Sequence, residues 1–415
     1  MTGNRHIDSS GFIIIYGVDM KVYERTLFSI DNSDRIYDYF GNCSMMERIA
    51  ELTAIFGSTR CLDVIPHFLN YNDYSILIDN KKEITFSSIS KAFLSNMQKI
   101  EMLFYQFWRK GSLTERDIQM LNNYLDLEEL RVEGHISSDK YNQEMNCFEA
   151  DILDPIIKMM NIQVMHDSIL DELFHAQYRM IDGFNSQLIE MKLRKKEIGV
   201  GKELKSNSVY VDNAAYCYQD ALKAIYKVLD IFSKWFSYIN NYENCRRKVE
   251  PKYFKDIKKE IMKLDNDSFR QRIEELYKSL EILTMIRNEI THNKSLARNR
   301  HVLFTGHGTP EVNNEDLFYS KILFWDHDEY VLEQANGCLG FFTQNRDVLT
   351  ETKDYFVNTI KLLILCQEHF FNKILDELAI MGIEKPYVWY GCPERRQCFT
   401  LEEIKKIYYY ENSLL

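Results

Sequence analysis

The chain has 415 residues, 45% hydrophobic and 27% charged, a composition that excludes wholesale disorder and predicts about two or three domains. Only 6 Pro and 16 Gly are present, which argues against a turn-rich β-sandwich or propeller and favours a mainly helical fold. With 51 basic and 62 acidic residues the net charge is −11, so any binding of nucleic acid must come from a local basic surface.

The nine cysteines are scattered along the chain, and their number is odd. This usage is typical of reduced thiols inside a cell rather than of a disulfide framework. The apolar run Phe12–Tyr16 is too short to cross a bilayer, and the polar N-terminus is not followed by a signal-peptide pattern. We therefore expect a cytoplasmic protein that has no membrane partner.

Residues 1–95 contain most of the strand-like signal. The segments 12–16 and 74–78 are rich in β-branched and aromatic residues, and the extended pattern resumes at 84–86 after a polar stretch. Residues 74–86 therefore predict a hairpin with a loop of about five residues. We expect a small α+β domain of unknown role over 1–95.

The remainder of the chain shows mainly helical periodicity. Helices are predicted over 152–193, 212–241, 252–293 and 350–381, with a short helix in the tail. Gly382 is the expected stop of the fourth helix, and a short strand is expected near Ile322–Trp325. A loop around 199–208 divides a helical region over 96–205 from a helical domain over 206–385, which precedes a tail over 386–415.

The segment Arg287-Asn288-Glu289-Ile290-Thr291-His292 lies at the end of a predicted helix and holds the residue types that metal-free RNA cleavage needs. The ribose 2′-hydroxyl must lose a proton as it attacks phosphorus, and an imidazole with an ordinary pKa of about 6.5 can take that proton. A guanidinium can stabilise the charge that develops on the phosphate. The pattern predicts His292 as general acid/base and Arg287 as phosphate-binding cation, with no metal and no cofactor.

The spacing of these residues adds a geometric expectation. On an ideal helix Asn288 and His292 share a face, whereas Arg287 lies about 140° from His292. The two catalytic candidates can therefore meet one phosphate only if the helix end is distorted or a second subunit closes the cleft. This favours a site built by a dimer.

An arginine followed by a histidine with four to six residues between them also occurs at Arg60–His67 and at Arg300–His307. The first of these segments contains a proline, and the second lies in a glycine-bearing loop. Of the three arginines, only Arg287 is followed directly by Asn and lies on a long amphipathic helix. It is therefore the strongest candidate.

The pattern Arg287-Asn288-x-x-x-His292 resembles the signature of the HEPN superfamily, a group of all-α domains that includes many metal-independent ribonucleases. The resemblance implies that Arg287 and His292 are the catalytic pair, that Asn288 supports them, and that 206–385 is a HEPN-like helical bundle. It also implies a homodimer in which two motifs face one cleft. The biological setting that it implies is a toxin or an antiviral-defence effector.

Local charge agrees with an RNA-facing surface. Residues 241–300 hold 15 Lys and Arg against 10 Asp and Glu, a net charge of +5 in a chain whose total is −11. The candidates for phosphate contacts just past the motif are Lys294, Arg298, Arg300 and His301. RNA is the expected partner.

The sequence thus predicts a mainly α protein with a HEPN-like bundle and a small N-terminal α+β domain, acting as a metal-independent endoribonuclease. A regulatory partner protein is a further candidate partner. Two alternatives stay open: a non-catalytic HEPN-like module that binds RNA or a nucleotide or holds a partner, and a purely structural helical interaction protein. An arginine and a histidine near a helix end can also simply bind the terminal carbonyls.

Overall fold

The computed structural model describes residues 75–78, 82–111, 114–148, 150–194, 203–205, 208–264, 266–292, 295–299, 301–306, 317–328, 341–344, 346–389 and 396–413. Most of these residues are helical, so the mainly α fold expected from the composition and the apolar periodicity is confirmed.

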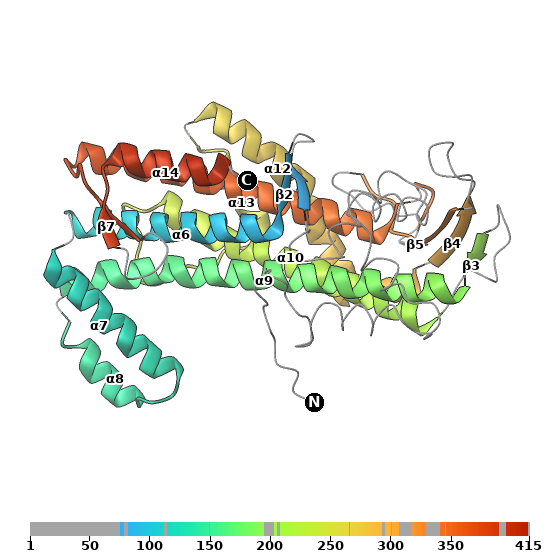
Figure 1. Ribbon diagram of the computed structural model, residues 1–415, viewed down its shortest axis with the longest axis horizontal. Coiled ribbons are helices and arrows are strands. Elements are labelled where there is room, and N and C mark those ends of the chain that lie inside the picture. The colour runs from blue at the N-terminus through green and yellow to red at the C-terminus, as the bar shows by residue number, and fades with distance from the viewer. Residues whose placement is uncertain are drawn as a thin grey trace, which may run out of the picture.

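The elements carry the labels of Figure 1. The helices are α6 (Phe86–Arg109), α7 (Glu115–Val132), α8 (Ser138–Met145), α9 (Ala150–Arg194), α10 (Val209–Asn240), α11 (Lys258–Ile261), α12 (Asp267–His292), α13 (Val348–Ile380) and α14 (Leu401–Ser413), with 3-10 turns η2 (Phe254–Asp256) and η3 (Leu296–Arg298). The strands form the antiparallel sheets β1 (Ser75–Ile78) with β2 (Lys82–Thr85), β3 (Glu203–Lys205) with β4 (His301–Gly306) and β5 (Leu317–Ile322), and β6 (Tyr387–Trp389) with β7 (Arg396–Cys398).

The long helices lie side by side in an elongated bundle (Figure 1). Helix α9 has 45 residues and is therefore about 68 Å long, which makes it the spine of the molecule. The pair α7 and α8 projects at one end of this bundle, and the sheet of β3, β4 and β5 lies at the other end. Among the helices that the structure describes, none combines the length and the apolar character needed to cross a bilayer.

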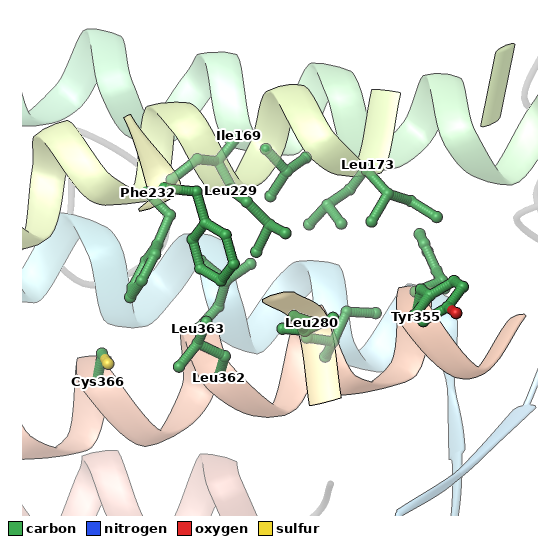
Figure 2. Packing of buried hydrophobic residues seen from close by; sticks show 14 of the residues in the cluster. Ile169, Leu173, Leu229, Phe232, Leu280, Tyr355, Leu362, Leu363 and Cys366 are labelled. Carbon is green, nitrogen blue, oxygen red and sulfur yellow. The ribbon is translucent and has the colours of Figure 1, made fainter. Parts of the chain in front are cut away.

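Helix α10 is the centre of the core. It packs against α9, α12 and α13, and it is buried around most of its circumference. Figure 2 shows aliphatic and aromatic side chains from the four helices converging: Ile169 and Leu173 of α9, Leu229 and Phe232 of α10, Leu280 of α12, and Leu362 and Leu363 of α13. Because α10 contacts α12 directly, side chains of α10 support α12 from the core side.

The hairpin predicted at 74–86 is confirmed, with a shorter connection than expected. Ser75 pairs with Thr85 and Ile78 with Lys82, so residues 79–81 join the strands. The polar stretch extends into β2 because main-chain pairing places no demand on the polarity of an edge side chain. Residues 1–74, over which the rest of the N-terminal α+β domain was expected, lie outside the described part of the chain.

Two of the predicted boundaries fall inside packed structure. Helix α6 begins directly after β2 at Phe86, so the boundary expected at 95 lies within this helix. One hydrophobic cluster contains residues from both sides of the boundary expected at 205, including Ile169 and Leu229. The helix predicted over 350–381 is confirmed as α13, which Gly382 ends with a left-handed φ of 75°. Helix α14 confirms the short helix predicted in the tail.

The continuous helix predicted over 252–293 is wrong. Helix α12 starts only at Asp267, because the side chain of Asn266 accepts a hydrogen bond from the backbone N–H of Phe269 at 3.0 Å and caps the new helix. The strand predicted near Ile322–Trp325 is also misplaced, since β5 ends at Ile322. The apolar residues beyond it are buried in an irregular segment, where the N–H of Phe324 donates to the carbonyl of Arg346 at 2.9 Å.

Replacing Gly183 with alanine is expected to destabilise the protein, although alanine favours helices. A Cβ at Gly183 of α9 would lie 2.6 Å from the ring of Tyr218 of α10, which is fully buried. Overpacking of this kind costs about 1–3 kcal/mol, more than the helix propensity of alanine returns. Chemical denaturation measures the loss in the free energy of unfolding. The double variant Gly183→Ala/Tyr218→Leu should lose less than the two single variants combined, and strict additivity would contradict the close contact.

Candidate functional site at the end of helix α12

The last turns of α12 turn one face to the core and the other to solvent. Ile286 and Ile290 are buried against the bundle, and Arg287 lies half-buried at the margin of this face. His292 follows Ile290 by two positions, which is about 200° around a helix. Its imidazole is accordingly exposed, as is the side chain of Asn288. The terminal face of α12 therefore presents polar groups on a rigid, buried support.

The guanidinium of Arg287 is held on its inner side by α10. Its Cζ atom lies 5.5 Å from the centre of the Tyr226 ring, in a cation–π contact. Its Nη1 atom also donates to the Oδ1 atom of Asn288 at 3.1 Å. The structure thus brings together two of the three residues of the predicted site, and it adds Tyr226 to them.

Asp230, one turn further along α10, completes the environment of Arg287. Burial raises the pKa of the Asp230 carboxyl group, while the N–H of Phe254 and the positive charges of Lys234 and Arg287 act in the opposite direction. The Phe254 N–H donates to Oδ1 of Asp230 at 2.9 Å. A carboxylate fixed in this way can orient the guanidinium electrostatically.

His292 is the final residue of α12 and stands apart from Arg287. Within the part of the chain that the structure describes, His292 makes no hydrogen bond and no ion pair. The helix remains regular to its end, so the separation of about 140° expected from the spacing persists. A single chain therefore does not direct both side chains at one phosphate.

The residues predicted to contact phosphate beyond the motif have different outcomes. Arg298 is exposed in the last turn of η3. Lys294 and Arg300 lie outside the described residues. The prediction for His301 is wrong, because only 3% of this residue is exposed: it pairs with the buried Ile322 at the start of β4. A phosphate backbone cannot reach a side chain at that depth. The other two arginine–histidine patterns, 60–67 and 300–307, include residues that are not described.

A polar cluster that the sequence analysis did not single out lies where α13 begins. The Nε2 atom of His327 is 3.4 Å from Oε2 of Glu351 and 3.3 Å from the hydroxyl of Tyr355, and Nη1 of Arg346 lies 2.8 Å from Oε1 of Glu351. Burial raises the pKa of Glu351, but the hydrogen bonds from His327 and Arg346 outweigh this effect and hold the pKa below its ordinary value. These residues are up to 28 positions apart, and no spacing in the sequence signals their meeting.

This cluster lines a cavity of about 390 Å³ whose other wall is α12. Its polar groups largely satisfy one another: Arg346 also donates to the carbonyl of His327 at 3.1 Å and to the side chain of Gln344 at 2.5 Å. The cluster therefore ties the irregular segment around 327 to the first turn of α13. We assign it a structural role.

No group of three or more His, Cys, Asp or Glu residues suited to a metal ion occurs in the described ranges. No family model matches the chain, and comparisons with curated proteins and with solved structures found no match.

Proposed function

We propose that this protein is a metal-independent endoribonuclease. The proposal is carried by the end of α12, where an exposed histidine follows an arginine that α10 holds half-buried. It is supported by the HEPN resemblance of Arg287, Asn288 and His292. The same resemblance implies a role as a toxin or an antiviral-defence effector.

The reaction needs two proton transfers and one cation. An imidazole of His292 takes the proton of a ribose 2′-hydroxyl while the 2′-oxygen bonds to the adjacent phosphorus. The bond from phosphorus to the 5′-oxygen breaks, and this oxygen takes a proton from a water molecule, whose hydroxide is then neutralised by the imidazolium. Arg287 stabilises the negative charge on the non-bridging oxygens. The products are a 2′,3′-cyclic phosphate end and a 5′-hydroxyl end.

A homodimer resolves the divergence of the two side chains. A second copy related by a two-fold axis can place its His292 beside Arg287 of the first chain, and the reverse. The proposed site is therefore composite.

The test is cleavage of an unstructured RNA by the full-length protein in the presence of EDTA. We expect cleavage to persist and the products to carry 2′,3′-cyclic phosphate and 5′-hydroxyl ends. Loss of cleavage in EDTA, or 3′-hydroxyl product ends, would contradict the metal-free mechanism. Salt-sensitive RNA binding without any cleavage would favour the non-catalytic alternative.

A mixing experiment tests the composite site. Arg287→Ala and His292→Ala proteins are each expected to be inactive. After the two variants are mixed and allowed to exchange subunits, about one quarter of wild-type activity should return, since half of the dimers are mixed and each holds one intact pair. Inactivity of the mixture, with subunit exchange verified, would reject pairing across the dimer.

Replacing Asp230 with asparagine is expected to reduce cleavage by about tenfold, because Arg287 loses the charge that orients it. The asparagine side chain can still accept the hydrogen bond from Phe254, so thermal stability should change little. Initial cleavage rates and melting temperatures measure the two effects. Asp126→Asn, an exposed change on α7, is the matched control. Equal rates for the two variants would remove Asp230 from the site.

A further inference from the structure

The short helical segment before α12 is amphipathic. Phe254, Ile257, Ile261 and Leu264 are buried in the core. Their spacing of three or four residues directs the intervening side chains outward. Lys255, Lys258, Lys259 and Lys263 are all exposed at such positions, together with Asp256 and Met262. Burial of the apolar face thus fixes a row of lysines on the surface.

Positive charge is concentrated in this part of the chain. Residues 246–263 contain eight Lys and Arg but only three Asp and Glu, which accounts for the whole excess of +5 over residues 241–300. Some of these cations form ion pairs with nearby carboxylates. Nζ of Lys252 lies 2.6 Å from Oε1 of Glu260, and Nζ of Lys258 lies 3.3 Å from Oε2 of Glu281.

The remaining cations have no such partner. Lys255, Lys259 and Lys263 form no ion pair with any residue in the described ranges. They recur every four positions along the segment. We call these three residues the lysine row. An uncompensated row of this kind attracts a linear polyanion.

The lysine row runs along α12 toward Arg287. Near Lys263, the carbonyl of Leu264 accepts a hydrogen bond from Arg270, close to the start of α12. At the other end of the row, the ring of Phe254 lies 4.7 Å from that of Tyr277, further along the same helix. The segment is therefore antiparallel to α12, and its Lys255 end points toward the end of α12.

The row ends beside the candidate site. The backbone N–H of Phe254, the neighbour of Lys255, donates to Asp230, and the same carboxyl group is within the electrostatic reach of Arg287. Tyr253, which directly precedes Phe254, has 54% of its surface exposed. An exposed aromatic ring beside a basic track provides a surface on which an unpaired base can stack.

We propose that the lysine row binds the backbone of single-stranded RNA, with a base stacked on Tyr253, and leads the strand to Arg287 and His292; the role as a path to cleavage rests on the proposed function. The lysines track phosphates without reading sequence. The stacking ring favours a single strand, because the bases of a duplex are already stacked.

The test measures binding of a fluorescein-labelled 20-nucleotide oligouridylate to full-length His292→Ala protein, by fluorescence anisotropy over a range of NaCl concentrations. In this background, Lys255→Gln/Lys259→Gln/Lys263→Gln should raise Kd by about 30-fold at low salt and reduce the slope of log K against log salt by about 2, the value for three lost single-strand contacts. The matched control is Lys140→Gln/Lys385→Gln/Lys405→Gln, which changes the net charge equally at exposed positions on other elements. It should change Kd by less than about threefold.

Further variants and competitors separate the parts of the proposal. Tyr253→Ala should raise Kd by about tenfold and Tyr253→Phe should not, as expected for stacking. Equal changes in Kd for the two triple variants would overturn the role of the lysine row. Stronger competition by duplex RNA than by oligouridylate would overturn the preference for a single strand. Binding that depends on the row in a protein that never cleaves RNA would reject the proposed function alone. Cleavage by the unsubstituted protein with row-independent binding would reject the row alone.

Discussion

Replacing His292 with alanine is expected to reduce RNA cleavage by about 10²–10⁴-fold, the range that a positioned acid/base group contributes. The side chain is exposed at the last position of α12 and makes no hydrogen bond or ion pair with a described residue. Its removal should therefore leave the fold unchanged. Single-turnover cleavage rates at saturating protein measure the chemical step without a contribution from RNA affinity.

His175→Ala is the matched control, because His175 is another exposed histidine on a long helix. It should cleave at the wild-type rate. A His292→Ala protein that cleaves as fast as this control would refute the catalytic assignment. For Arg287, the informative variant is lysine: it keeps the charge but lacks the planar fork, so cleavage should fall well below wild type yet stay above that of Arg287→Ala.

Local sequence patterns predicted the fold correctly where a single residue determines the end of a helix. Gly382 ends α13 with a positive φ, as glycine at a helix stop predicts. The split before α12 had a comparable signal in Asn266, a favoured N-cap residue, but the apolar spacing on both sides of it continues almost in register. Periodicity alone therefore joined two helices that a cap separates.

The sequence predicted the candidate site only in part, because the surroundings of its residues depend on contacts between positions that are far apart in the chain. The motif located Arg287, Asn288 and His292, and the spacing predicted their divergence on the helix. The support of Arg287 comes from Tyr226, 61 positions earlier, and no local pattern links the two. His301 shows the converse error: a polar residue beside a basic cluster suggests exposure, but this residue lies in β4 with only 3% of its surface exposed.

The second large effect that we expect is on the pH dependence of stability, and it arises from a buried histidine–glutamate pair in the bundle core. Nδ1 of His166 on α9 lies 2.7 Å from Oε1 of Glu101 on α6, and both side chains are almost completely buried. Burial lowers the pKa of His166 to about 3. Burial, together with the negative charge of Asp167, raises the pKa of Glu101 well above its ordinary value of 4.5. A carboxyl group whose pKa is raised in this way keeps its proton to higher pH, and from Glu101 that proton can be donated to the imidazole.

The pair holds one proton in the folded protein, and this determines the sign of the pH dependence. Between pH 4.5 and 6.5 the unfolded chain also holds one proton, on the histidine, so stability does not change through this pair. Above pH 6.5 the unfolded chain loses that proton while the folded pair keeps it, so stability falls as pH rises. Below pH 4.5 the unfolded chain gains a second proton, and stability falls as pH decreases toward 3.

We therefore expect Glu101→Gln to remove a pH-dependent loss of stability of about 1.4 kcal/mol per pH unit above pH 6.5. The glutamine amide can donate to Nδ1 in place of the carboxylic acid, but it has no proton to lose. Urea denaturation at pH 6.5 and 8.5 measures the effect as a difference between variant and wild type, since the titration of other groups is common to both. Glu129→Gln, an exposed change on α7, should retain the wild-type slope. If the Glu101→Gln slope equals that of Glu129→Gln, Glu101 is ionised in the folded core and His166 does not hold its proton in place.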